Sequence, residues 1–200
     1  DLYDQDAIEL HGSLHERAEN LPPMLQRWRA LKNKPWCLAL AAEDINLYRR
    51  YITYYYALVS EIDDHIGRIL AVLDEEGLAD NTIVLYTSDH GDFVGHHGMI
   101  EKCAWGHNVY EDTLHVPLIV RWPGYVRKGD RREDLVELVD LFPTLMELSG
   151  VPAPAGYDLP GRSLVATLNA GQPVGHEVAF SDNWSQVAAS GPDQKLGAWI

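Results

Sequence analysis

Cysteine is scarce in this 200-residue chain, which has only Cys37 and Cys103, far apart in the sequence. Two thiols cannot form the disulfide framework of a small secreted domain, so we expect both to be free; one bridge between them stays open. Long hydrophobic runs are also missing, and no stretch reaches the ~20 apolar residues of a membrane-spanning helix. We expect no membrane partner. Residue 1 lies in polar, loop-like sequence, which predicts that further sequence precedes it.

Basic residues are few, with 16 Lys and Arg against 30 Asp and Glu and a formal net charge of −14. This balance disfavours a nucleic-acid partner or an anionic membrane surface. An anionic substrate would need a local positive centre, which a metal ion with one or two basic side chains can supply. A hydrophobic content of 46 % is enough for one domain with a sizeable core, or for a large part of a bigger one.

Apolar periodicity predicts a long amphipathic helix that ends near Gly77, a glycine suited to a left-handed C-cap. Its apolar stripe, with steps of three and four, should cover a sheet. The stripe consists of Ile52, Tyr55, Val59, Ile62, Ile66, Ile69 and Leu73. Shorter helices are predicted at Met24 to Leu31, Phe142 to Leu148 (stopped by Gly150) and Leu164 to Leu168.

Thr82 to Thr87 is a β-branched apolar run without polar alternation, which predicts a strand buried on both faces. Further strands are predicted at Pro117 to Trp122, Leu135 to Val139 and Glu177 to Phe180. A helix, a short turn and then a buried strand is the pattern of an α/β fold, with a mostly parallel sheet flanked by helices. Ligand sites in such folds lie at the carboxyl ends of the strands.

At that end of the first strand lies Ser88-Asp89-His90-Gly91-Asp92. An Asp oxygen and a neutral imidazole nitrogen are suitable ligands for a divalent cation, so Asp89 and His90 are candidate metal ligands. The alternative is that Asp89 caps a turn while His90 is a buried, hydrogen-bonded histidine. The long Gly- and His-rich loop that follows, through Val109, favours the functional interpretation. Two ligands do not complete a site, and we identify no second cluster in the chain that is suited to supply the others.

Lys102 lies in the same loop and would suit an anionic ester oxygen as a compact positive charge. A solvated surface lysine is the alternative, and spacing alone does not separate the two. His96, His97 and His107 are either additional site residues or loop-holding residues, and we expect His97 to hold the loop through hydrogen bonds.

Several short sequence blocks along the chain resemble those of one known enzyme family, and they occur in the same order as in that family. They are Tyr3-Asp4 with Asn20-Leu21-Pro22-Pro23, Tyr56 to Gly67, Thr87 to Gly91, Gly95 to Lys102, Val116 to Val120 with Trp122-Pro123-Gly124, Val139 to Thr144, and Gly161 to Leu164. Together they resemble the sulfatases of the alkaline-phosphatase-like superfamily.

The resemblance implies an alkaline-phosphatase-like sandwich, of which residues 1–165 would be the later half of the catalytic domain and residues 166–200 the start of a C-terminal region. It implies metal-dependent hydrolysis of a small-molecule sulfate ester. Asp89 and His90 would bind the metal, with calcium first and manganese as the alternative, and Lys102 would contact the sulfate. Compartment and oligomeric state are not predicted.

The nucleophile of that family is a formylglycine made from Cys or Ser in a Cys/Ser-x-Pro-x-Arg motif, and no such motif occurs here. Cys37 precedes Leu38-Ala39, and Cys103 precedes Ala104-Trp105. We therefore expect the formylglycine upstream of Asp1, and we expect this chain alone to be inactive and to bind metal poorly.

Two other functions stay open. Many sulfatases have Asn at the position of His90. A His at this position resembles the phosphonate monoester hydrolases, which favour manganese. A phosphonate or phosphodiester hydrolase is therefore one alternative. A non-catalytic sulfatase-like binding protein is the other. Loss of the nucleophile motif from the upstream sequence would favour the latter.

Overall fold

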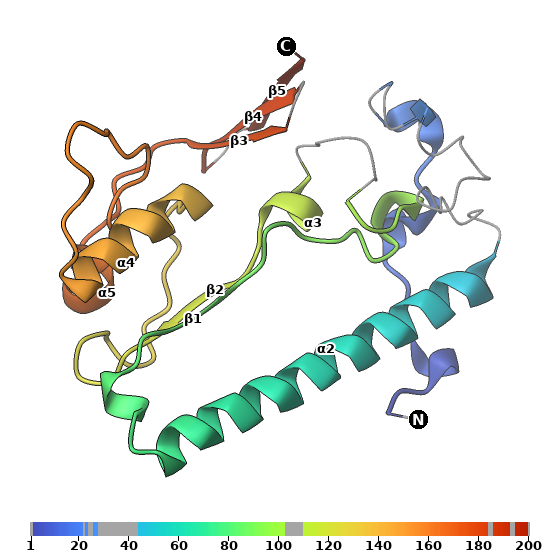
Figure 1. The fold of residues 1–200 in the computed structure, drawn as a ribbon. Coiled ribbons are helices and arrows are strands. Elements are labelled where there is room, and N and C mark those ends of the chain that lie inside the picture. The colour runs from blue at the N-terminus through green and yellow to red at the C-terminus, as the bar shows by residue number, and fades with distance from the viewer. Residues whose placement is uncertain are drawn as a thin grey trace. The chain divides into compact units, whose positions relative to one another are not determined.

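The structure of the chain is a computed structural model (Figure 1). It describes residues 2–21, 23, 26–27, 44–102, 110–183, 186–192 and 195–199. The chain forms two units. Unit 1 comprises Asp1–Val72 and His90–Val116, and unit 2 comprises Leu73–Asp89 and Pro117–Ile200.

The described helices are α2 (Ile45–Glu75), α3 (Glu111–Leu114), α4 (Leu141–Ser149) and α5 (Val165–Ala170). The described strands are β1 (Val84–Thr87), β2 (Leu118–Arg121), β3 (Ala179–Asn183), β4 (Gln186–Ser190) and β5 (Lys195–Trp199). Short 3-10 helices form at Gln5–Ala7, Gly12–His15, Ala18–Asn20, Ala79–Asn81, His96–Gly98 and Leu138–Asp140. The helix predicted at Met24 to Leu31 lies largely outside the described residues.

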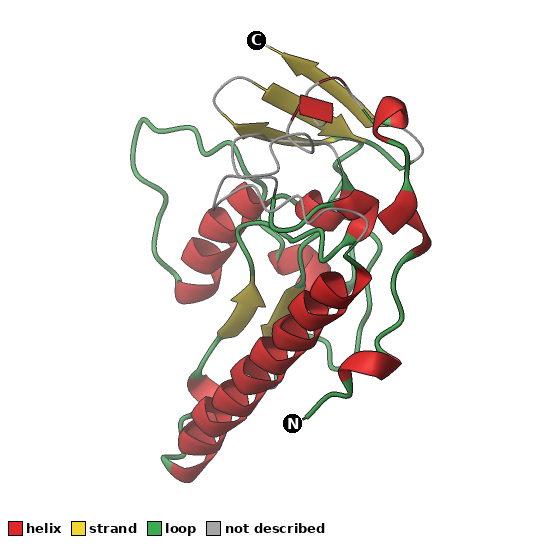
Figure 2. Cartoon of the chain, turned by 90° about the vertical axis from the view of Figure 1, so that its right-hand side faces the viewer, coloured by secondary structure: helices red, strands yellow, loops and turns green. Residues whose placement is uncertain are grey.

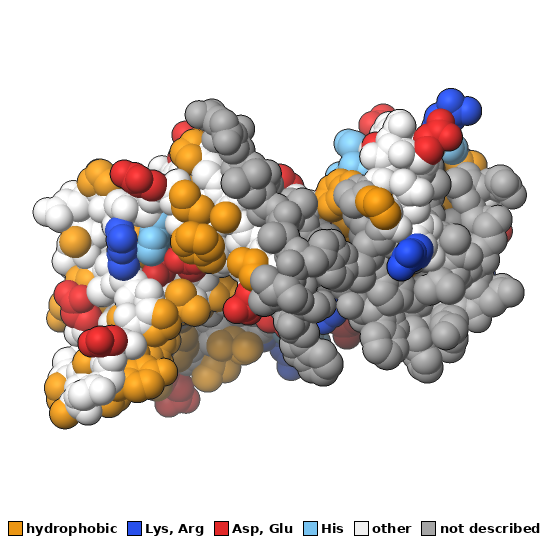
Figure 3. All heavy atoms as spheres, turned by 90° about the horizontal axis from the view of Figure 1, so that it is seen from above, with side chains coloured by type: hydrophobic (Ala, Val, Ile, Leu, Met, Phe, Trp, Pro, Cys, Tyr) orange, Lys and Arg blue, Asp and Glu red, His pale blue; other side chains and the backbone are white. Residues whose placement is uncertain are grey.

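The predicted long helix is confirmed as α2, the longest helix in Figure 1. It ends as expected, because Gly77 has a φ of 65° and the Leu78 amide donates to the Leu73 carbonyl at 2.8 Å. The apolar stripe is buried only near its start, at Ile52, whereas Ile69 is 61 % exposed. The expectation that a sheet covers this stripe stays a prediction. Other hydrophobic side chains also reach the surface, among charged ones, in Figure 3.

The core of unit 1 joins α2 to the N-terminal segment and to the loop that follows β1. Tyr48 on α2 is fully buried and packs with Leu14 and Ile100. Its hydroxyl donates to the Gly98 carbonyl at 2.7 Å. A second cluster consists of Leu21, Phe93 and Met99, with Tyr110 packed against it. The loop is thus part of a packed core, and burial of its apolar side chains stabilises it.

Two of the predicted strands are present in unit 2 as β1 and β2, but their direction differs from the expectation. They pair antiparallel, with Val84 opposite Arg121 and Thr87 opposite Leu118 (Figure 1). They are also only partly buried, since Tyr86 is 38 % and Ile119 is 60 % exposed. The expected burial of Thr82 to Thr87 on both faces is therefore wrong, and this pair departs from the mostly parallel arrangement expected for the sheet. An apolar run reports a tendency to be buried, but not which strand lies beside it or in which direction.

The remaining strands of unit 2 form a three-stranded antiparallel sheet in the order β3-β4-β5 (Figure 2). Only its first strand overlaps a predicted one. The strand predicted at Leu135 to Val139 is wrong, because Leu138–Asp140 forms a 3-10 helix in which the Asp140 carboxylate accepts from the Glu137 amide. The predicted helices are confirmed as α4, which ends at Gly150 with a φ of 69°, and α5.

Candidate active site

The loop from Gly91 to Lys102 is anchored at its start by a close approach between two backbones in unit 1. The Gly91 amide donates to the Thr113 carbonyl at 3.0 Å. A Cβ atom at position 91 would lie 2.0 Å from the carbonyl oxygen of Asp112, so no residue with a side chain fits there unless α3 shifts. The glycine of the Asp89-His90-Gly91 sequence therefore fixes the position of His90.

Unit 1 brings two of the predicted site residues together. Lys102 Nζ lies 3.0 Å from Nε2 of His90, although twelve residues separate them in the sequence. The other ring nitrogen of His90, Nδ1, lies 2.8 Å from the Gly91 carbonyl oxygen. A carbonyl can only accept, so the hydrogen-bond network assigns the proton to Nδ1 and leaves a lone pair on Nε2. The Lys102 ammonium donates to that lone pair.

Asp89 is exposed and is the last residue of its segment of unit 2, whereas His90 begins a segment of unit 1. The pair that unit 1 brings together is therefore His90 and Lys102. Asp89 remains a predicted metal ligand through its place in the sequence next to His90.

Asp92 connects the two ends of the loop. Its Oδ1 atom accepts from the Val94 amide at 2.7 Å and from the Glu101 amide at 3.0 Å. Its Oδ2 atom accepts from the Tyr51 hydroxyl of α2 at 3.1 Å. Burial raises the pKa of Tyr51 well above its ordinary value, and the negative charge of Asp92 raises it further. The phenol therefore remains a donor to the carboxylate.

Backbone strain is concentrated in this loop. Among the described residues, the only non-glycine residues with positive φ are Val94 (48°), His97 (56°) and Glu101 (52°). Side-chain-bearing residues enter this region at a cost on the order of 1 kcal/mol each. Such strain persists only where surrounding contacts fix the backbone, and it is common at functional sites.

The loop histidines that the structure describes bind acidic partners. The His97 amide donates to Ser13 Oγ at 3.0 Å, and its ring pairs with Glu16, which confirms the prediction that His97 holds the loop. The ring of His96 pairs with Asp112 and stacks on His11 with centroids 3.9 Å apart. His107 lies outside the described residues.

Tyr110 packs beside these pairs, with its ring centroid 4.5 Å from that of His97. Burial raises the pKa of Tyr110, and the charges of Glu16 and Asp112 add to the effect. The tyrosine therefore stays neutral next to two carboxylates.

Comparison with known proteins identifies the family of this fold and loop. The Sulfatase family model matches residues 9–151. The chain belongs to the sulfatase family. It is 32 % identical over 149 residues to arylsulfatase K of Xenopus laevis, covering 74 % of this chain and 26 % of that protein. It is 38 % identical over 121 residues to an N-acetylglucosamine-6-O-sulfatase of Bacteroides thetaiotaomicron, covering 60 % of this chain and 21 % of that protein.

The solved phosphonate monoester hydrolase of Agrobacterium radiobacter is also similar to this sulfatase chain. The TM-score is 0.69 at 25 % identity, over 80 % of this chain and 35 % of that one. The predicted alkaline-phosphatase-like class is thereby confirmed. This sulfatase chain spans about a quarter of the length of the curated relatives it matches.

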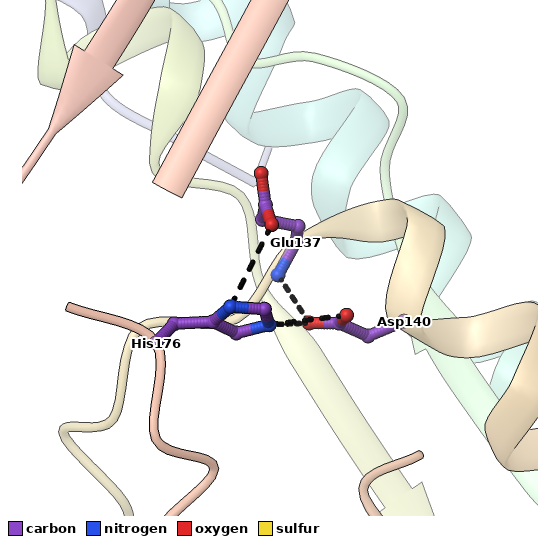
Figure 4. Close-up of side chains that lie close together, drawn as sticks. All are labelled: Glu137, Asp140 and His176. Carbon is purple, nitrogen blue, oxygen red and sulfur yellow. Dashed lines mark hydrogen bonds and ion pairs between the residues drawn. The ribbon is translucent and has the colours of Figure 1, made fainter. Parts of the chain in front are cut away.

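The sulfatase chain also contains a cluster that the sequence analysis did not identify, formed by Glu137, Asp140 and His176 (Figure 4). One potential ligand atom from each lies within 4.8 Å of the others. Asp140 is completely buried, and its two oxygens lie 3.0 and 3.2 Å from His176 Nε2. Glu137 Oε2 lies 3.8 Å from the other ring nitrogen, Nδ1. A separation of 36 residues between Asp140 and His176 conceals this cluster in the sequence.

The two carboxylates of this cluster approach opposite nitrogens of one ring, Asp140 at Nε2 and Glu137 at Nδ1. Asp140 also accepts from the backbone amides of Glu137 at 2.8 Å and Arg162 at 2.7 Å. In the described arrangement the cluster therefore fastens the segment before β3 to the start of α4.

None of the helices in the described residues is sufficiently long and apolar to cross a membrane.

Proposed function

We propose that the intact protein is a sulfuric ester hydrolase in which Asp89 and His90 hold a divalent metal ion and Lys102 binds the sulfate group. The observation that supports this proposal most directly is the 3.0 Å contact between Lys102 Nζ and His90 Nε2. It concentrates a positive charge beside a metal-ligating type of nitrogen, in a chain whose net charge is −14. Membership of the sulfatase family supplies the reaction class.

The residues present fit a metal ion. His90 Nδ1 faces the Gly91 carbonyl, so Nε2 offers its lone pair to a cationic group, and in the described structure that group is the Lys102 ammonium. A carboxylate oxygen, which Asp89 offers, and an imidazole nitrogen are together a donor set that divalent cations accept. We propose that the metal is calcium. Manganese is the alternative, because an imidazole ligand suits manganese better than an amide ligand does. When bound, the metal would polarise an ester oxygen.

Lys102 would act on the anionic parts of the substrate. Its ammonium would bind a sulfate oxygen and stabilise the negative charge that develops on the leaving oxygen. Because that charge grows in the transition state, the lysine would contribute more to turnover than to substrate binding. The formylglycine nucleophile is expected in the sequence before Asp1.

The proposal is tested by the metal dependence of the full-length protein. Release of sulfate from an aryl sulfate ester should cease after dialysis against a chelator and return with calcium, or with manganese under the alternative. His115→Ala, at an exposed histidine that pairs with Glu111, should leave this dependence unchanged. Full turnover by the chelator-treated protein, verified as metal-free, would contradict the proposal.

A phosphonate monoester hydrolase is the second candidate, favoured by the similarity to the Agrobacterium radiobacter enzyme. Sulfate and phosphonate monoesters present the same tetrahedral oxyanion to a metal and a lysine, so the site alone accommodates both. Comparison of kcat/KM on an aryl sulfate and on an aryl phosphonate monoester, with the same full-length preparation, discriminates between them.

A further inference from the structure

We propose that Asp92 is a positioning residue, whose carboxylate fixes the backbone at Glu101 and thereby holds Lys102 against His90. The consequence for turnover rests on the function proposed above, but the consequence for the position of Lys102 does not.

The hydrogen bonds of Asp92 span the whole loop between the two site residues. Asp92 lies two positions after His90, and Glu101 lies directly before Lys102. One oxygen, Oδ1, accepts from the Val94 amide and from the Glu101 amide, so a single atom ties the start of the loop to its end. The backbone bond from the Phe93 amide to the Glu101 carbonyl, at 2.9 Å, lies beside this link.

Glu101 requires such a link because its backbone is strained. Its φ of 52° is unfavourable for a residue with a side chain, and relaxation to negative φ would turn the chain that follows. The next residue is Lys102, whose exposed side chain meets His90. Loss of the Asp92 carboxylate would therefore free the backbone at Glu101, and the side chain of Lys102 would no longer be directed at His90.

The opposite side of the carboxylate is fixed to α2. The Tyr51 hydroxyl donates to Oδ2 at 3.1 Å, from a phenol whose pKa is raised by burial and by Asp92. Since Tyr51 packs against the cluster of Leu14, Tyr48 and Ile100, the carboxylate is held by a packed helix rather than by the loop alone. This support allows one side chain to determine the backbone at the exposed end of the loop, where Glu101 and Lys102 lie.

Two substitutions separate the geometry of Asp92 from its charge. Asp92→Asn retains an oxygen that can accept from both amides, and its NH2 group can donate to the Tyr51 hydroxyl. Asp92→Ala removes all three bonds. We expect the asparagine variant to behave like the wild type and the alanine variant to release Lys102.

The test measures acylation of lysine amines by an amine-reactive acetyl ester in the full-length protein, after removal of bound metal with a chelator and without substrate. Peptide mass spectrometry identifies the labelled lysines. An amine held by His90 reacts slowly, so the labelling rate of Lys102 should rise several-fold in Asp92→Ala and stay near the wild-type rate in Asp92→Asn. Lys128, which is exposed in unit 2, should label at the same rate in all three proteins. An unchanged rate at Lys102 in a folded alanine variant would overturn the proposal.

If Asp92→Ala does not fold, hydrogen exchange of the wild-type protein provides the second measurement. The Glu101 amide should exchange as slowly as a core amide in the wild type and faster in Tyr51→Phe, which removes one support of the carboxylate. Fast exchange of that amide in the wild type would likewise overturn the proposal.

The turnover readout separates this inference from the proposed function. On an aryl sulfate, Asp92→Ala should lower kcat by on the order of tenfold or more with a smaller change in KM, and Asp92→Asn should restore kcat. If the wild type labels as expected but releases no sulfate, the proposed function fails while the positioning role stands. If the wild type turns over and labelling of Lys102 is unaffected by Asp92→Ala, the positioning role fails alone.

Discussion

At the scale of single residues, the sequence contains much of the candidate site but not the contacts that organise it. Asp89, His90 and Lys102 follow from the residue types at the end of a strand and from the family resemblance. The acceptor role of Asp92 toward the Glu101 amide does not, because it depends on a loop that closes over nine residues. The cluster of Glu137, Asp140 and His176 was missed for the same reason.

Substitution of His90 tests its predicted role as a ligand. His90→Ala should lower the calcium or manganese affinity of the full-length protein by at least about tenfold, because the imidazole nitrogen would be lost from the coordination shell. Isothermal titration calorimetry measures this affinity. The matched control is His115→Ala, at a histidine that is 79 % exposed, and it should bind metal as the wild type does. Equal affinities in the two variants would remove His90 from the metal site.

Gly91 offers a test of the loop anchor. Gly91→Ala would place a methyl group 2.0 Å from the Asp112 carbonyl oxygen, and the required shift should lower the free energy of unfolding by roughly 1–3 kcal/mol. Gly67→Ala, on α2 with nothing within 4 Å, should instead raise it by up to about 1 kcal/mol. Denaturant unfolding of the full-length variants provides both values. A Gly91→Ala protein as stable as the wild type would show that the approach to Asp112 is not constrained.

At the scale of elements, local patterns predicted helices better than strands. The three-and-four periodicity and Gly77 predicted α2 and its end, because both are properties of one segment. The direction of β1 against β2 depends on the path of the chain between them, which the apolar runs do not encode. Leu135 to Val139 is largely apolar but leads into the 3-10 helix Leu138–Asp140, because the Asp140 carboxylate accepts from the Glu137 amide.

The hydrogen bond from the Tyr51 hydroxyl of α2 to the Asp92 carboxylate in the loop predicts that the free energy of unfolding depends on pH in the alkaline range. The pKa of Tyr51 is raised in the folded protein, chiefly by burial and then by Asp92. The folded state therefore retains this proton while the unfolded state loses it, so stability is complete below about pH 10 and declines as pH rises above that value. Tyr51→Phe should show a shallower decline, since the raised pKa of Tyr51 would no longer contribute to it. Unfolding free energies measured across this alkaline range decide the point, and parallel curves would contradict it.

Asp140 should be the main stabilising residue of the cluster before α4. Its side chain is fully buried and accepts from two backbone amides and from the His176 ring. Asp140→Ala leaves these donors unsatisfied and should cost about 2–4 kcal/mol of unfolding free energy. Asp158→Ala, at an exposed aspartate, should change it by less than about 0.5 kcal/mol. Similar melting curves for the two variants would contradict the role of Asp140.

At the scale of the whole molecule, the order of the sequence blocks identified the family, and the match over residues 9–151 confirms it. Such blocks are informative together because each occupies a defined place in one fold, whereas Asp89-His90-Gly91 alone would be a weak pattern. The boundary between residues 165 and 166 stays a prediction. The three-stranded sheet β3-β4-β5 was largely unpredicted, since its short strands carry few strong apolar periods.

The central claim is that His90 and Lys102 belong to one site that acts on a sulfate ester. Steady-state kinetics of the full-length protein on an aryl sulfate test it most directly, with Lys102→Ala compared with Lys128→Ala. We predict that kcat/KM falls on the order of 100-fold or more in Lys102→Ala and is unchanged in Lys128→Ala. A Lys102→Ala protein with the kcat/KM of the wild type would contradict the claim.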